Sequence, residues 1–351
     1  MVMLAEVVDA VIGVDTHRDV HVVEMASPSG SRIATIEIAN SSGGFARLLA
    51  WLAEHAPGPR VVAAVEGTRS YGIGLSRALA AAGLPVIECE QPASKDRRGR
   101  GKSDAIDAHL AVLFALRQDA DRLPVPRADG VREALRILLS ARQEMVTTCT
   151  GQINRLRALL LSGEDRDRTA SRAAFTDTAL SSLARRRLPA DADRAQAVRH
   201  HEIRRLAVAV REANRALRAN RRELCELVDQ IAPGLTDRPG IGPVSAAQVI
   251  VSYSHLGRVR NDAAFAKLAG TSPIPASSGH TVRHRLNRGG DRALNRAVHT
   301  IALVRMRSCD RTRAYVARRT TDGKTSREIR RAIKRYITRE LYRALTAAMT
   351  T

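Results

Sequence analysis

The chain has 351 residues and a formal net charge of +21 at pH 7, because 57 lysine and arginine residues outnumber 36 acidic ones. This charge is unusual for an enzyme of small metabolites and indicates a polyanionic partner, which we expect to be nucleic acid. Aromatic residues make up only 3% of the chain. Contact with a duplex backbone is therefore favoured over base stacking as the main mode of binding.

Neither membrane insertion nor secretion is expected. No apolar run approaches the ~18 residues of a transmembrane helix, and the start lacks the basic region of a signal peptide. The four cysteines are far apart and form no Cys-x-x-Cys pair, so neither a zinc site nor a disulfide framework is predicted. We expect a cytoplasmic, nucleoid-associated bacterial protein.

Residues 1–125 are predicted to form an α/β domain. The strand signals lie at residues 11–14, 21–25, 31–38, 61–65 and 85–89, with a turn at 27–30. Helical patterns lie at 45–54 and 73–82, and a last helix begins at Ser103. This order is that of an RNase H-type, or RuvC-like, domain. In that arrangement the first and fourth strands are neighbours.

Four acidic residues are the candidate metal ligands of this domain. Asp15 and Glu66 follow the first and fourth strands, and Asp104 and Asp107 share one face of the last helix. Four carboxylates at one point repel each other unless cations are present. Mg²⁺, or else Mn²⁺, prefers such oxygen ligands, so the pattern predicts a one- or two-metal phosphoryl-transfer site. Acids in a first helical turn are also explained by the helix dipole alone.

A basic run precedes the last helix. We expect it to hold a nucleic-acid backbone against the acidic residues, although such runs are often only solvated loops. Its candidate binding residues are Arg97, Arg98, Arg100 and Lys102.

Residues 126–232 are predicted to be a helical, coiled-coil region. Apolar residues repeat at alternating steps of three and four from Ile203 to Ile231, with one polar interruption at Asn220. The stripe is typical of a coiled-coil seam between chains, or of a helix that pairs with residues 131–161 of the same chain. Residues 162–199 are expected to be irregular helix and loop, and His200 and His201 to be surface residues.

Residues 233–351 are predicted to form a mainly α-helical third domain. Gly240 and Gly242 resemble the turn of a helix-hairpin-helix, in which glycines let backbone N–H groups approach a phosphate, or else a plain packing corner. A proline-containing loop at 269–280 precedes a basic run, and ten basic residues follow between 318 and 343 on a predicted helix. The basic run contributes four candidate binding residues, Arg283, Arg285, Arg288 and Arg292.

The ordered set of motifs resembles a known family. Gly-Val-Asp-Thr, Val-Glu-Gly-Thr and Lys-Ser-Asp-Ala-Ile-Asp-Ala are followed by Pro-Gly-Ile-Gly, Phe-Ala-Lys-Leu-Ala-Gly-Thr-Ser-Pro, Ser-Ser-Gly and Asn-Arg-Gly-Gly-Asp-Arg. Over about residues 8–345, they resemble the DEDD insertion-sequence transposases of the IS110 type, whose relatives include the Piv DNA invertases.

The resemblance implies a RuvC-like catalytic domain, a coiled-coil dimerisation region and a C-terminal transposase domain. Its metal ligands map to Asp15, Glu66, Asp104 and Asp107. Its serine nucleophile, which directly precedes a glycine, maps to Ser278, with Ser277 as the neighbouring ambiguity. The implied partners are donor and target DNA, a non-coding bridge RNA, and further copies of the chain as a dimer or, on nucleic acid, a tetramer.

Two enzymatic interpretations remain open at this point. In the first, a recombinase uses the metal site together with the serine, so that the two distant parts of the chain meet within one chain or across a dimer. In the second, a RuvC-like nuclease or Holliday-junction resolvase uses water. A non-catalytic nucleic-acid-binding protein is disfavoured by the complete set of acids.

Overall fold

The computed structural model describes residues 2–89, 104–276 and 284–350, with the side chains of residues 104 and 105 outside this description. The chain divides into two compact units. Unit 1 contains Met1–Glu133, Tyr253–Phe265 and Met349–Thr351, and unit 2 contains Ala134–Ser252 and Ala266–Ala348. In the parts of the chain that the structure describes, no helix combines the length and apolarity needed to cross a membrane.

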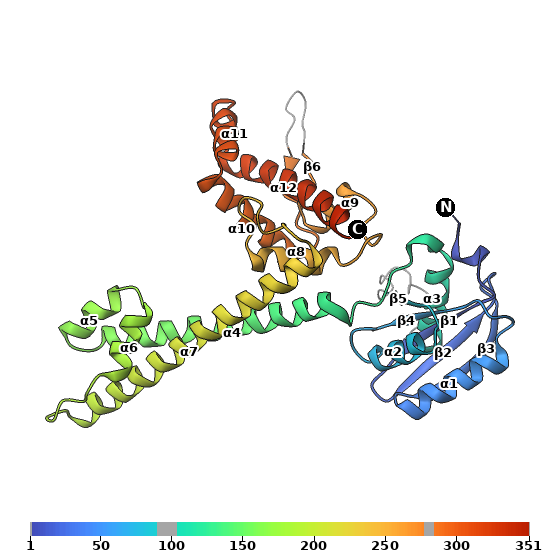
Figure 1. Cartoon of the computed structure of the whole chain (residues 1–351), viewed down its shortest axis with the longest axis horizontal. Coiled ribbons are helices and arrows are strands. Elements are labelled where there is room, and N and C mark those ends of the chain that lie inside the picture. The colour runs from blue at the N-terminus through green and yellow to red at the C-terminus, as the bar shows by residue number, and fades with distance from the viewer. Residues whose placement is uncertain (1, 90–103, 277–283, 351) are drawn as a thin grey trace. The chain divides into compact units, whose positions relative to one another are not determined.

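Unit 1 is built on a five-stranded sheet with the strand order β3-β2-β1-β4-β5 (Figure 1). β1 pairs antiparallel with β2 and parallel with β4, which confirms that the first and fourth strands are neighbours. The elements of this unit are η1 (Leu4–Glu6), β1 (Ala10–Thr16), β2 (Val20–Ala26), β3 (Arg32–Ala39), α1 (Ser42–His55), β4 (Val61–Glu66), α2 (Ile73–Ala81), β5 (Val86–Cys89), α3 (Asp104–Leu116) and η2 (Ala120–Arg122).

Helices cover both faces of this sheet. On one face, Ile12 and Val14 pack with apolar residues of α1 and α2, and on the other, Val11 and Ala64 pack with α3. Burial on both faces explains why β1 and β4 read as continuous apolar runs in the sequence. α3 lies directly on β1 at Gly13, where a Cβ atom would stand 2.1 Å from the carbonyl oxygen of Ala108. Glycine at this position therefore permits the close approach of helix and strand.

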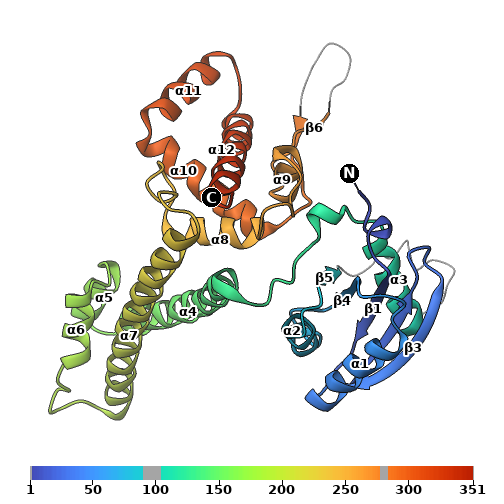
Figure 2. The same ribbon diagram turned by 45° about the vertical axis from the view of Figure 1, so that its right-hand side comes forward.

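Two long helices form one part of unit 2. They are α4 (Gly130–Leu161) and α7 (Arg194–Ile231), and they lie side by side in Figure 2. The amide nitrogen of Asn220 donates to the carbonyl oxygen of Leu138 at 3.0 Å, and Arg142 donates to the Asn220 side-chain oxygen at 3.2 Å. The polar interruption of the α7 stripe is thus satisfied by α4 of the same chain. A seam between chains stays a prediction.

Two short helices, α5 (Asp165–Arg172) and α6 (Asp177–Arg185), occupy the segment expected to be irregular helix and loop. α6 packs on α7. The prediction that His200 lies on the surface is wrong, because this residue is buried, whereas His201 is exposed. The cover supplied by α6 is the reason, since Arg204, one turn later, donates to the Ala184 carbonyl at the end of α6.

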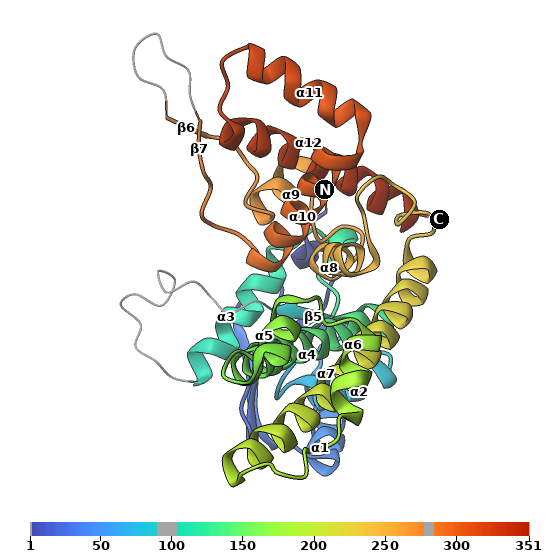
Figure 3. The ribbon, with the colours of Figure 1, turned by 90° about the vertical axis from the view of Figure 1, so that its left-hand side faces the viewer.

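The C-terminal part of the chain is mostly helical (Figure 3). The predicted basic tail is two helices, broken at Gly323, whose φ is +73°. The elements are α8 (Pro243–Tyr253), α9 (Asp262–Leu268), β6 (Ile274–Pro275), β7 (His284–Arg285), α10 (Arg292–Ser308), α11 (Asp310–Thr321) and α12 (Ser326–Ala348). β6 and β7 pair antiparallel and frame the predicted serine loop.

Candidate active site

Two of the predicted acids lie at the ends of neighbouring parallel strands. Side chains alternate along a strand, so Asp15 shares the α3-covered face with Gly13, and Glu66 shares it with Ala64. The register pairs Val14 with Val65, which makes Asp15 and Glu66 the next positions along two strands about 4.8 Å apart. Asp15 is 7% exposed and Glu66 is 9% exposed.

The third acid comes from the helix above them. Asp107 is 8% exposed and directly precedes Ala108, which makes the close approach to Gly13. Asp104 is the first residue of α3 and lies one turn earlier on the same helical face, but its side chain is outside the described atoms. Among the described residues, which exclude that fourth carboxylate, no group of three or more His, Cys, Asp or Glu side chains is arranged to hold a metal ion.

Two further groups adjoin the acids. The Nε2 atom of His17 lies 3.2 Å from Oδ2 of Asp15, and the His17 ring is about half exposed. Cys89 pairs in register with Glu66 and is buried. Burial raises the pKa of the Cys89 thiol, and the neighbouring carboxylates of Glu66 and Glu88 raise this pKa further, so the thiol stays protonated.

A buried carboxylate, that of Glu24, fastens α3 to the sheet near the acids. Glu24 in β2 is opposite Gly13 in the register and only 1% exposed. Its Oε1 atom lies 2.6 Å from Nδ1 of His109, and Arg32 donates from Nε to Oε2 at 3.0 Å. Since His109 is two residues after Asp107, this contact holds the first turns of α3 in place.

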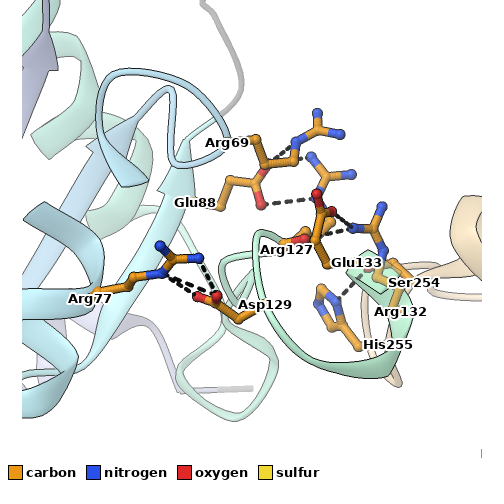
Figure 4. A network of polar contacts seen from close by, with 9 residues as sticks. All are labelled: Arg69, Arg77, Glu88, Arg127, Asp129, Arg132, Glu133, Ser254 and His255. Atoms are coloured by element: carbon orange, nitrogen blue, oxygen red, sulfur yellow. Dashed lines mark hydrogen bonds and ion pairs between the residues drawn. The ribbon is translucent and has the colours of Figure 1, made fainter. Parts of the chain in front are cut away.

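A second network surrounds Glu88 at the end of β5 (Figure 4). Arg127 bonds to both Glu88 oxygens, and Arg69, three residues after Glu66, lies 3.5 Å from one of them. Burial raises the pKa of Glu88, but the Arg127 hydrogen bond and the charges of Arg127 and Arg69 outweigh burial and lower this pKa below its usual value. Figure 4 also shows Arg77 paired with Asp129, beyond this network.

The two glycines of the predicted turn before α8, Gly240 and Gly242, have different surroundings. Gly240 has a φ of +74°, and a Cβ atom there would stand 3.0 Å from Cγ of Arg305 and 3.1 Å from the Ile301 carbonyl oxygen. This contact with α10 favours the packing-corner interpretation for Gly240. Gly242 has open space where a Cβ atom would stand, so it remains the better candidate for backbone contact with a phosphate.

The remaining predicted residues are only partly described. Three of the predicted arginines are exposed to solvent: Arg285 in β7, Arg288 between β7 and α10, and Arg292 at the start of α10. The others lie outside the described residues: Ser277, Ser278, Arg283, Arg97, Arg98, Arg100 and Lys102.

Comparisons with known proteins identify the family. A family profile described as "Transposase", for the DEDD transposases of IS110, matches residues 12–163, and one described as "Transposase IS116/IS110/IS902 family" matches residues 232–317. The first profile therefore covers β1 from residue 12 onward, together with all of β4, α3 and α4. The family suggests dependence on a divalent metal ion.

Two curated proteins are similar to the chain. An uncharacterized 42 kDa protein of insertion element IS900 from Mycobacterium paratuberculosis is 26% identical, over 89% of each chain. An uncharacterized 43.6 kDa protein of insertion element IS110 from Streptomyces coelicolor is 35% identical over 33% of this chain and 29% of its own length. With both profiles matched in order, the chain belongs to the IS110 transposase family, and it is an enzyme that cleaves and rejoins DNA strands.

Proposed function

We propose that the protein is an RNA-guided DNA recombinase that joins a metal-binding acidic site to a serine nucleophile. The observation that carries the proposal is the parallel pairing of β1 and β4, whose ends carry the buried Asp15 and Glu66 on the sheet face that α3 covers, with Asp107 buried on α3. The strand order supports assignment to the RNase H-like, or RuvC-like, folds.

The acids fit a hard divalent cation. Carboxylate oxygens are the ligands that Mg²⁺ and Mn²⁺ prefer, and crowded buried carboxylates are stabilised by such an ion. Asp15, Glu66, Asp104 and Asp107 would hold it. When bound, the ion polarises a phosphate oxygen and neutralises developing charge.

In the proposed reaction, the hydroxyl oxygen of Ser278 attacks the phosphorus of a DNA phosphodiester. A bond forms between this oxygen and phosphorus, and the bond to one deoxyribose oxygen breaks. The serine proton leaves to a base, and the departing oxygen takes up a proton as a free hydroxyl. The phosphoserine ester keeps the energy of the broken bond, so a deoxyribose hydroxyl of another strand can later displace the serine.

Basic residues supply the remaining parts of the proposed site. Arg285 in β7, and Arg283 two residues earlier in the sequence, would stabilise the charge of the transferring phosphate. The positively charged surface would bind donor DNA, target DNA and a non-coding bridge RNA. Because the guide RNA would read the sequence, few side chains are needed at base edges.

We also propose three functional regions and a homo-oligomer. Residues 1–125 would be the RuvC-like catalytic domain, 126–232 the coiled-coil region and 233–351 the transposase domain with the serine. A dimer, and a tetramer on nucleic acid, would bring acids and serine together in cis or across protomers. The protein would act in the bacterial cytoplasm, on the nucleoid.

The alternative is a metal-dependent nuclease or junction resolvase in which water attacks the phosphate. The contact between His17 and Asp15 favours this candidate, because the half-exposed imidazole could accept a proton from water at the acidic site. Ser278 would then have no chemical role.

A denaturing gel of labelled DNA separates the two candidates. The recombinase forms a covalent protein–DNA adduct, and Ser278→Ala loses both adduct and cleavage, whereas the matched control Ser277→Ala retains them. Asp104→Ala should also lose cleavage while nucleic-acid binding persists. If the wild-type protein cleaves DNA without forming an adduct, the nuclease is supported instead of the recombinase. If the adduct is lost in Ser277→Ala alone, the nucleophile is Ser277.

A further inference from the structure

Two packed helices of unit 2, α10 and α12, bring a basic cluster together. Arg330 and Lys334 are four residues apart on α12, and Asn295 and His299 are four residues apart on α10, so each pair shares a helical face. Lys334 is only 8% exposed, and its Nζ atom donates to Oδ1 of Asn295 at 2.7 Å. Within the described ranges, no carboxylate forms a salt bridge with this buried ammonium.

Arg330 leaves a donor unused beside this ammonium. Its Nη2 atom donates to the Ser326 hydroxyl at 3.2 Å. Its Nε atom is buried and has no hydrogen-bond partner among the residues that the structure describes. A buried N–H group of this kind usually has a partner, which points to a ligand that supplies an acceptor.

The charges of this cluster have the same sign. Burial lowers the pKa of Lys334, and the charge of Arg330 lowers it further. Burial also lowers the pKa of His299, and Lys334 and Arg330 add to this effect. A bound anion would reverse these electrostatic contributions, because an opposite charge favours the protonated forms.

Asn295 connects the cluster to the base of the β6–β7 hairpin. Its Nδ2 atom donates to the carbonyl oxygens of Ala269 at 2.6 Å and Gly270 at 3.4 Å. The next residue, Thr271, bonds through its hydroxyl to that of Thr338 on α12 at 3.1 Å. The same asparagine side chain therefore contacts the buried lysine and the backbone that leads into β6.

We propose that Lys334, Arg330 and His299 bind one backbone phosphate of the DNA substrate, and that Asn295 is a positioning residue that links this site to the base of the hairpin. Lysine and arginine bind phosphate oxygens through charge-assisted hydrogen bonds, and the burial of Lys334 strengthens such a contact. DNA is favoured over RNA because the hairpin is the segment that must reach the cleaved strand. This last argument rests on the proposed function, in which the hairpin carries Ser278.

The first test measures DNA binding by Lys334→Met, which removes one charge at nearly constant volume. For a labelled duplex, the slope of log K against log salt should become shallower by about 0.9, since one phosphate contact is lost. The matched control is Arg47→Met, which removes an exposed charge from α1 in unit 1 and should keep the wild-type slope. A wild-type slope in a folded Lys334→Met protein would overturn the proposal.

The second test measures the protonation of His299 in the wild-type protein. In full-length protein labelled with ¹³C at histidine Cε1, His299→Gln assigns the His299 resonance. The His299 pKa should rise when duplex DNA is added, because a phosphate adds negative charge beside the ring. If the His299 pKa is unchanged by DNA and by RNA, the phosphate site is refuted. If it changes only when duplex RNA is added, the site binds an RNA phosphate and the proposal for DNA is wrong.

Cleavage by Asn295→Ala tests the positioning role separately. The single-turnover rate should fall by about tenfold to a hundredfold, with the salt slope of DNA binding retained. An unchanged cleavage rate would show that Asn295 has no positioning role. The salt slope and the His299 titration do not depend on the serine chemistry. If no protein–DNA adduct forms, the proposed function is rejected, but these two measurements still decide whether the phosphate site exists.

Discussion

Gly13→Ala tests whether the contact between α3 and β1 sets the geometry of the acidic site. The added methyl group would lie 2.1 Å from the carbonyl oxygen of Ala108, and 2.8 Å and 2.9 Å from atoms of Val112. Ordinary van der Waals contact begins at 3.4 Å. Two of the three neighbouring atoms belong to the backbone, so rotation of a side chain cannot relieve the clash. The helix must move away from the strand by roughly 1 Å.

This displacement should reduce both stability and activity. Overpacking of a core contact typically lowers the free energy of unfolding by about 1–3 kcal/mol. Asp107 is joined to Ala108 and should move with it. A misplacement of about 1 Å at a reacting centre lowers rates by about a hundredfold. We therefore expect DNA cleavage by Gly13→Ala to fall by about two orders of magnitude under conditions where the protein is folded.

The assay is single-turnover cleavage of labelled DNA, together with urea unfolding followed by circular dichroism. Gly43→Ala in α1 is the matched control, because a Cβ atom there meets nothing within 4 Å. In a helix, this replacement should raise the free energy of unfolding by up to about 1 kcal/mol and leave cleavage unchanged. Wild-type stability and cleavage in Gly13→Ala would show that α3 is not constrained by this contact.

Three further predictions concern other parts of the chain. Glu88→Gln should lower the free energy of unfolding by about 1–3 kcal/mol at pH 7. Because the pKa of Glu88 is lowered in the folded protein, its stabilising contribution is present above pH 4.5 and is lost as the pH falls through the folded pKa. The urea midpoints of mutant and wild type should therefore converge in acid. A difference in midpoint that stays constant with pH would contradict this. Asn220→Ala should lower the free energy of unfolding by about 1–3 kcal/mol, since the Leu138 carbonyl loses a donor and Arg142 keeps only the Leu217 carbonyl as an acceptor. A changed sedimentation coefficient with unchanged unfolding would instead assign Asn220 to an interface between chains. Asp107→Asn should abolish cleavage with either Mg²⁺ or Mn²⁺ while the melting temperature is retained, and wild-type cleavage rates would remove Asp107 from the site.

The sequence predicts where the candidate acids lie because strand ends are readable from local patterns. Apolar runs that stop at Asp15 and Glu66 show where β1 and β4 end, and the order of elements places these strands side by side. Asp107 is predictable for the same reason, because the spacing of residues on one helical face is a local pattern. The predictable part of the site is thus the part whose geometry follows from one strand or one helix at a time.

The supporting residues were not predictable from local patterns. Glu24 looks like an ordinary polar residue of a strand, and its partner His109 is 85 residues away in the sequence. Glu88 likewise bonds to Arg127, 39 residues later. The burial of His200 depends on a separate helix, α6, whose packing on α7 cannot be predicted from the sequence of α7 alone. The two-residue strands β6 and β7 are too short to produce an alternating pattern.

The buried thiol beside Glu66 has a consequence for ion selectivity. Zinc, cadmium and other soft ions gain much of their affinity from thiolate ligands, whereas magnesium and manganese prefer oxygen. Cys89 would have to lose its proton in an apolar site next to two carboxylates before it could bind a soft ion, and burial together with those charges opposes that loss. Beside the proposed oxygen ligands, the sulfur of Cys89 is therefore a neutral thiol before any ion binds. A thiophilic metal would have to displace this proton to gain a sulfur ligand, whereas magnesium or manganese bound by the carboxylates would not.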